Sequence, residues 1–161
     1  MADPHVLPAA VVVASNRAAA GVYADETGPL IVAALRELGF EVGEPAVVPD
    51  GEPVGVAIAE AIAAGARVVL TTGGTGLTPT DRTPEVTRPL LDREVPGIAE
   101  AIRPRRGPGS AVGRALPRRR GHRRAGAGRE PARSRGGVKD GLAVLRSWLV
   151  HAVEQVVGSD H

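Results

Sequence analysis

The chain has 161 residues, which is enough for one domain with a single hydrophobic core. The absence of cysteine excludes disulfides, thiol nucleophiles and cysteine-based zinc sites, so any metal must be bound by oxygen or imidazole ligands. No apolar run is long enough to span a bilayer, and the first residues lack the pattern of a signal peptide. We therefore expect a cytoplasmic protein without a membrane partner.

The formal net charge of +2 is distributed very unevenly along the chain. Residues 103–135 contain twelve arginines and one acidic residue, a net charge of +11, so the remainder of the chain carries −9. Such a segment is typical of nucleic-acid-binding arms or of disordered chains. Because the positive charge is confined to one aperiodic segment, nucleic acid is not the partner that we expect.

In chain order, three apolar segments are predicted to be strands, and helices alternate with them. The strands are predicted at 11–14, 41–48 and 67–70, and the helices between them at 29–38 and 56–64. This β-α-β-α-β order predicts an α/β fold with three layers, in which helices cover both faces of a mostly parallel central sheet (α/β/α). We expect it to form a single domain over 1–161. Further helices are predicted at 84–92, 98–103 and 138–157, and the segment 103–135 is expected to be irregular.

A glycine-rich loop follows the third predicted strand, and it contains Gly73, Gly74, Thr75 and Gly76. Three glycines in four residues allow a tight turn that exposes backbone N–H groups, which suits an oxyanion such as phosphate. The loop lacks the Gly-Lys-Ser/Thr ending of a P-loop and the third glycine of G-x-G-x-x-G. A tight turn between a strand and a helix is the alternative interpretation.

Two aspartates follow predicted strands at the edge of the sheet where ligands bind in open parallel sheets. Asp50 comes after the second strand and Asp81 after the third. Thr83 is predicted to cap the next helix, with Pro84 at its first position, which leaves Asp81 free to bind a cation. For Asp50, an ordinary Asp-Gly turn is the alternative.

Several separated motifs occur together in one order. They are TTGGTGLTPTDRTPEVT followed by VPGIAEAIR, the amino-terminal VVVASNRAAAGVYADETGPLIVAALRELGFEV and the carboxy-terminal GGVKDGLAVL. With these motifs the chain resembles the molybdopterin adenylyltransferase family, which includes MogA, MoaB and the G domain of gephyrin. The resemblance covers most of residues 9–102 and 136–157.

The resemblance implies transfer of AMP from ATP to molybdopterin with Mg²⁺, by an enzyme of molybdenum cofactor biosynthesis that forms a homotrimer. It implies that Asp50 and Asp81 are catalytic residues and metal ligands, and that the loop 73–76 contacts phosphate. Ser15, after the first strand, could contact pterin or phosphate, with a solvated loop as the alternative. A molybdopterin-binding protein of the same fold without turnover is the alternative function.

Residues 103–135 depart from the family, in which an Asn-Leu-Pro-Gly motif precedes the last helix. Gly128–Arg133 can be encoded GGC CGT GAA CCT GCC CGG, and reading one base later gives Ala-Val-Asn-Leu-Pro-Gly. We hypothesise that approximately this interval is translated in a shifted reading frame.

Overall fold

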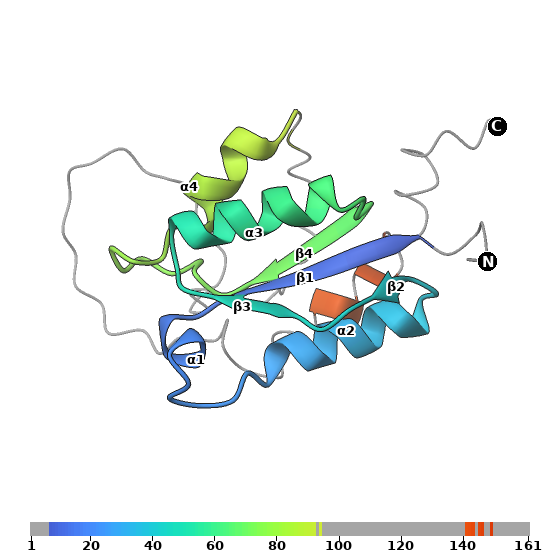
Figure 1. Cartoon of the computed structure of the whole chain (residues 1–161), viewed down its shortest axis with the longest axis horizontal. Helices are drawn as coiled ribbons and strands as arrows, with labels where there is room; N and C mark the ends of the chain where they lie inside the picture. Colours follow the sequence, from blue (N-terminus) through green and yellow to red (C-terminus); the bar gives the residue numbers. More distant parts are fainter. Residues whose placement is uncertain (1–6, 93, 95–140, 144, 147–148, 150–161) are drawn as a thin grey trace, which may run out of the picture.

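The computed structural model describes residues 7–92, 94, 141–143, 145, 146 and 149. In this part of the chain four strands form one parallel sheet with β1 at its centre (Figure 1). β4 pairs along one edge of β1, and β2 and β3 both pair along the other. The strands are β1 (Pro8–Ala14), β2 (Glu41–Val42), β3 (Ala46–Val48) and β4 (Val68–Thr72).

The second predicted strand, 41–48, is divided into two short strands. β2 pairs with Pro8 and Ala9 of β1, and β3 pairs with residues 12–14 of the same strand. The residues between them are Gly43, Glu44 and Pro45. Glycine and proline interrupt strands, because proline has no N–H to donate and glycine has no side chain to pack. Apolar patterning indicated the strand but not this interruption.

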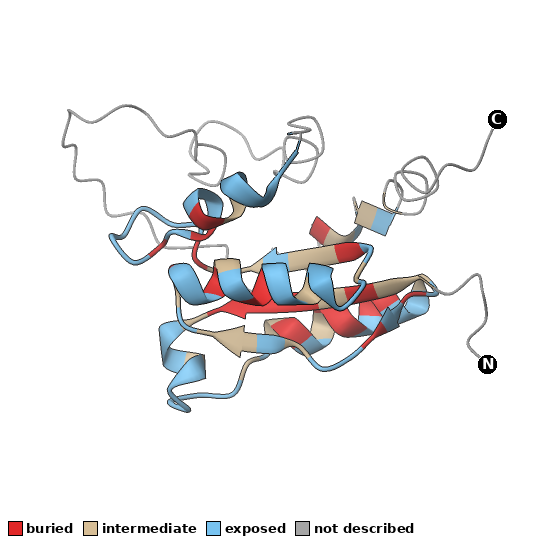
Figure 2. Cartoon of the chain, turned by 45° about the horizontal axis from the view of Figure 1, so that its top comes forward, coloured by how far each residue is buried: buried red, intermediate tan, exposed pale blue. Residues whose placement is uncertain are grey.

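Alternate residues of β1 pack against helices on opposite faces of the sheet. Val11 and Val13 join a buried cluster with α2 (Thr27–Glu37). Val12 and Ala14 join a second cluster with α3 (Glu52–Ala63) and α4 (Thr83–Thr87). The buried strand lies between these helices in both ribbon views (Figures 1 and 2). The predicted three-layer α/β/α arrangement is therefore confirmed.

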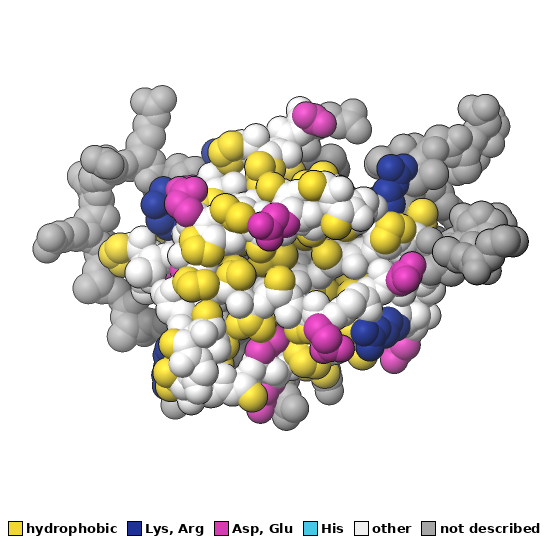
Figure 3. Space-filling model, viewed as in Figure 1, with side chains coloured by type: hydrophobic (Ala, Val, Ile, Leu, Met, Phe, Trp, Pro, Cys, Tyr) yellow, Lys and Arg dark blue, Asp and Glu magenta, His cyan; other side chains and the backbone are white. Residues whose placement is uncertain are grey.

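Two further elements complete these faces. α3 (Glu52–Ala63) buries Val54, Ala57 and Ile58, whereas Val56 and Ile62 remain exposed on a face that carries other apolar side chains (Figure 3). On the opposite side of the sheet, Leu142 and Leu149 pack against the cluster of α2. The described residues among 141–149 are helical, in agreement with part of the helix predicted at 138–157.

α2 begins two residues before the predicted start, because Asp25 caps its first turn. Oδ1 of Asp25 accepts hydrogen bonds from the N–H and O–H of Thr27, both at 3.0 Å. The N–H of Gly28 donates to Oδ2 at 3.0 Å. Ile31 and Leu35, one helical turn apart, then bury the apolar face of the helix.

The predicted helix at 84–92 consists of the short α4 (Thr83–Thr87) and a 3₁₀ turn, η1 (Arg88–Leu90). Pro89 explains this change, because it cannot donate the hydrogen bond that would continue an α-helix. The helix predicted at 98–103 and the irregular segment predicted at 103–135 lie outside the described residues. In the described part of the chain, no helix has the length and apolar character that crossing a membrane requires.

Candidate functional site

Residues that follow three strands meet at the carboxyl edge of the sheet. Ser15 follows β1, Asp50 lies beyond β3, and Gly73 follows β4. The N–H of Ser15 donates to the carbonyl of Val48 at 2.9 Å. The N–H of Asp50 donates to Oδ1 of Asn16 at 3.0 Å, in the short helix α1 (Asn16–Ala19). These two bonds hold the segments after β1 and β3 together.

The glycine loop turns tightly against the end of β1, and only glycine fits at two of its positions. Gly73 has a φ of +85°, and a Cβ there would collide with the carbonyl oxygen of Ala14. Gly74 has a φ of +61°, and a Cβ there would collide with Oδ1 of Asp50 and with Oγ1 of Thr83. The loop backbone therefore lies directly beside Asp50, without side chains in between.

Asp81 is buried, and it stabilises the turn that follows the glycine loop. Its Oδ2 accepts hydrogen bonds from the N–H of Thr78 at 3.2 Å and from the hydroxyl of Thr78 at 2.5 Å. The same oxygen lies 2.6 Å from the position of a Cβ on Gly76. The sequence-based argument that left Asp81 without a structural task is wrong, since Thr83 is the first residue of α4 and makes no capping bond.

The donor set of this edge fits a magnesium ion. Asp50 lies beside Gly74 and Asp81 beside Gly76, so two carboxylates lie against one glycine loop. Oδ1 of Asp81 accepts no hydrogen bond from the described residues. Mg²⁺ is commonly bound by one or two carboxylates together with substrate phosphates. Within the described ranges, no group of three or more His, Asp or Glu side chains could hold a metal ion.

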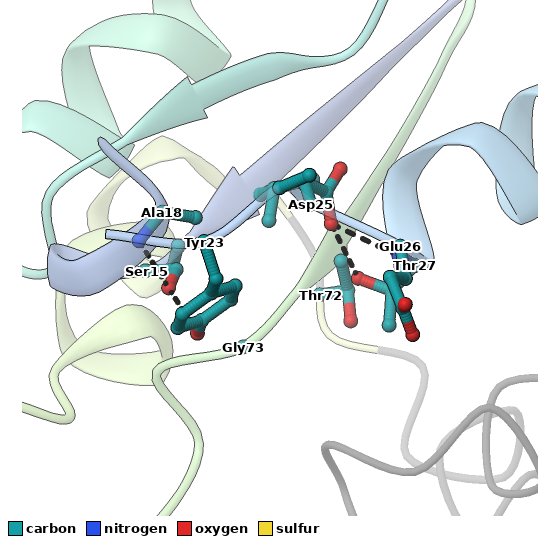
Figure 4. A pocket seen from close by; sticks show the side chains of 11 residues that line it. Ser15, Ala18, Tyr23, Asp25, Glu26, Thr27, Thr72 and Gly73 are labelled. Atoms are coloured by element: carbon teal, nitrogen blue, oxygen red, sulfur yellow. Dashed lines mark hydrogen bonds between the residues drawn. The ribbon is translucent and has the colours of Figure 1, made fainter. Parts of the chain in front are cut away.

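A cavity of about 390 Å³ opens beside the start of the glycine loop (Figure 4). Small apolar side chains of β1 and α1 line one part of it, and polar groups line another. Ser15 and Gly73, two of the predicted site residues, belong to its wall, whereas Asp50 and Asp81 do not. The lining residues are Val13, Ala14, Ser15, Ala18, Tyr23, Ala24, Asp25, Glu26, Thr27, Thr72 and Gly73.

Within this wall, the Ser15 hydroxyl is held by two contacts. Its Oγ lies 2.9 Å from the Tyr23 hydroxyl and accepts a hydrogen bond from the N–H of Ala18 at 3.2 Å. The guanidinium of Arg17 lies 5.2 Å from the centre of the Tyr23 ring, within reach of a cation–π interaction. Ser15 therefore caps α1 and also faces the cavity, which differs from a freely solvated loop.

Sequence reasoning did not identify Asn16 and Tyr23 as residues of the site, and it gave Thr83 only the role of a helix cap, which the structure does not show. Asn16 accepts a hydrogen bond from the main chain of Asp50, which lies 34 positions away in the sequence, so no local pattern indicates this contact. The Tyr23 hydroxyl contacts Ser15, and the N–H of Thr83 donates to the carbonyl of Gly74. Neither contact follows from a local sequence pattern. Thr75, the remaining predicted residue, lies exposed in the loop.

The chain matches the family model described as "Probable molybdopterin binding domain" over residues 10–124. A molybdenum cofactor biosynthesis bifunctional protein from Synechococcus elongatus is 40% identical over 157 residues, covering 95% of this chain and 48% of that protein. Molybdopterin adenylyltransferase from Pyrococcus furiosus is 42% identical over 92 residues, covering 57% of this chain and 54% of that protein. The chain thus spans about half the length of these curated relatives.

The fold is also found among solved structures. The molybdopterin biosynthesis Mog protein from Mycobacterium ulcerans is 37% identical with a TM-score of 0.72, covering 94% of this chain and 99% of that one. These matches confirm the resemblance that the motifs indicated. The chain belongs to the molybdopterin-binding domain family, with the fold of the MogA and MoaB proteins.

Proposed function

We propose that the protein acts in molybdenum cofactor biosynthesis as an enzyme that transfers AMP from ATP to molybdopterin. One observation carries this proposal. Two aspartates lie against the glycine loop at the carboxyl edge of the sheet, Asp50 at Gly74 and Asp81 at Gly76, and a cavity of about 390 Å³ opens beside Gly73. Relatives named molybdopterin adenylyltransferase support the same activity.

In the proposed reaction, an oxygen of the terminal phosphate of molybdopterin forms a bond to the α-phosphorus of ATP. The bond from that phosphorus to the bridging oxygen of the β-phosphate breaks, and pyrophosphate leaves with the electron pair. The attacking phosphate is already anionic at neutral pH, so the site needs no general base. Its task is to align two polyanions and to stabilise the negative charge of the transition state.

Named groups of the chain can perform this task. The main-chain N–H groups of 73–76 and the hydroxyl of Thr75 would orient phosphate oxygens. Asp50 and Asp81 would hold Mg²⁺, which supplies charge neutralisation at the phosphates when it is bound. Ser15, in the wall of the cavity, would contact the pterin or its phosphate.

The test is to incubate the purified chain with molybdopterin, ATP and MgCl₂ and to measure pyrophosphate release and adenylyl-molybdopterin by mass spectrometry. We expect both products in equal amounts, and neither when Mg²⁺ is chelated. Binding of molybdopterin without pyrophosphate release would instead identify a carrier of the same fold. Absence of binding would contradict both functions.

A further inference from the structure

The hydroxyl of Thr83 is buried and has no structural role among the described residues. The residue is 3% exposed, and its Oγ1 has no hydrogen-bond partner among the described residues. A buried hydroxyl that forms no hydrogen bond destabilises a protein, and valine would fill the same space without this penalty. The presence of threonine at this position therefore calls for an explanation outside the stability of the fold.

Helix capping does not provide this explanation. Thr83 is the first residue of α4, and its side chain forms no capping bond. Thr87, one turn later, shows how a threonine is ordinarily satisfied in this helix, because its hydroxyl donates to the carbonyl of Thr83 at 2.7 Å. The two threonines differ in their surroundings, since Thr83 is the one beside the glycine loop.

The location of the Thr83 hydroxyl connects it to the candidate site. Oγ1 of Thr83 and Oδ1 of Asp50 both contact the place where a Cβ of Gly74 would lie. The N–H of Thr83 donates to the carbonyl of Gly74 at 3.0 Å. The main chain of Thr83 is thus bound to the proposed phosphate loop, while its hydroxyl lies alongside a proposed metal ligand.

We propose that Thr83 is a positioning residue for Asp50, an inference that rests on the proposed function. When phosphate and cation occupy the loop, the Thr83 hydroxyl donates a hydrogen bond to Oδ1 of Asp50 and fixes the orientation of that carboxylate. A hydrogen bond from a hydroxyl to a carboxylate is short and strong, and such outer contacts set how well a ligand holds its metal. Gly74 would link phosphate binding to the orientation of Thr83, because its backbone would contact the phosphate and its carbonyl accepts a hydrogen bond from the N–H of Thr83.

Two substitutions separate the hydroxyl from the shape of the side chain. Thr83→Val keeps the shape and removes the hydroxyl, whereas Thr83→Ser keeps the hydroxyl and removes a buried methyl group. Thr87→Val is the matched control, since it removes from the same helix a hydroxyl that donates to the carbonyl of Thr83 and does not lie at the Cβ position of Gly74. For each full-length variant we would measure the Tm, the Kd for ATP as a function of Mg²⁺ concentration, and the rate of AMP transfer.

We expect Thr83→Val to have a Tm at or above that of the wild type and to bind MgATP about tenfold or more weakly, as substitutions behind metal ligands commonly do. Its AMP transfer should fall by a similar factor. Thr83→Ser should show a lower Tm but nearly unchanged MgATP affinity and transfer. Thr87→Val should leave MgATP affinity unchanged.

Unchanged MgATP affinity in Thr83→Val would overturn the inference, as would equal losses in Thr83→Val and Thr83→Ser. If the wild type binds MgATP but transfers no AMP, the proposed function fails, and the affinities of the variants alone decide the role of Thr83. If the wild type does not bind MgATP, both proposals fail.

Discussion

Asp81 has one structural task and one proposed task, and substitution by alanine alone would not separate them. Its Oδ2 holds the backbone and the hydroxyl of Thr78, and its Oδ1 accepts no hydrogen bond from the described residues. Asparagine can retain the first role through its amide oxygen but carries no charge for a cation. Alanine removes both roles.

We therefore predict that Asp81→Asn and Asp81→Ala both reduce AMP transfer by about two orders of magnitude or more, while molybdopterin binding is largely kept. Asp50→Ala should act in the same direction. In thermal unfolding, Asp81→Ala should have the lower Tm of the two Asp81 variants, since only alanine leaves Thr78 without its acceptor. Wild-type turnover in Asp81→Asn would remove the charge of Asp81 from the mechanism.

Gly73 of the glycine loop can be compared with Gly39, which has a similar positive φ but open space around its Cβ position. Gly73 and Gly39 have nearly equal φ values of +85° and +87°, but a Cβ on Gly39 has no neighbour within 4 Å. Gly39→Ala should cost about 1–2 kcal/mol from the left-handed backbone alone. Gly73→Ala should cost clearly more and abolish transfer, because its Cβ collides with the backbone of β1. Denaturant unfolding measures the free energy of unfolding of each variant. Equal losses of this free energy in Gly39→Ala and Gly73→Ala would contradict the prediction.

At the scale of elements, the start of α2 is held by one carboxylate. Asp25 is the acceptor for the N–H and O–H of Thr27 and for the N–H of Gly28. The same segment forms part of the cavity wall beside the glycine loop. The cap therefore contributes to the shape of the cavity as well as to the stability of the helix.

We predict that Asp25→Ala lowers the free energy of unfolding by about 1–2 kcal/mol, the usual effect of losing an N-terminal cap. Asp25→Asn should lose less, since its amide oxygen can still accept from Thr27. Urea titration of both variants gives the comparison. Equal stability of Asp25→Ala and the wild type would show that the helix does not depend on this cap.

The sequence predicted those strands and helices whose formation depends on the pattern of apolar residues. Uninterrupted apolar runs such as 11–14 indicated strands buried on both faces, and the β-α-β order indicated parallel pairing. The interruption at Gly43–Pro45 and the early start of α2 depend on single contacts, which apolar periodicity does not record. At the site, the positions of the loops after the strands placed Ser15, Asp50 and Gly73 at one edge. The hydrogen bonds of Asp81 and Asn16 depend on how the chain folds in space, which a linear pattern does not record.

For the whole molecule, our hypothesis of a shifted reading frame concerns residues 103–135, which carry a net charge of +11. We predict that restoring the neighbouring reading frame brings back Asn-Leu-Pro-Gly, lowers the pI to an acidic value, and raises both thermal stability and AMP transfer. A patch of net charge +11 repels itself and offers few apolar residues for a core. The test is to sequence the gene, to express the written chain and the frame-restored chain side by side, and to measure the Tm and the rate of AMP transfer of each. Equal stability and activity of the two versions would refute the shifted frame.

The family's usual assembly further predicts a homotrimer. Sedimentation equilibrium should give about three times the mass of one chain, with the frame-restored version as the reference. A stable monomer of that version would contradict the prediction.

The division of one strand into β2 and β3 has a consequence for how copies of this protein can meet. Within the described sheet these two strands form the outer edge beyond β1, and each has only two or three residues. Edge strands with long rows of unpaired N–H and C=O groups recruit other chains and promote aggregation. Pro45 removes one donor from the middle of this edge and leaves no continuous row. Within the described residues this edge gives little backbone for extending the sheet, so we expect copies that meet along it to associate mainly through side chains.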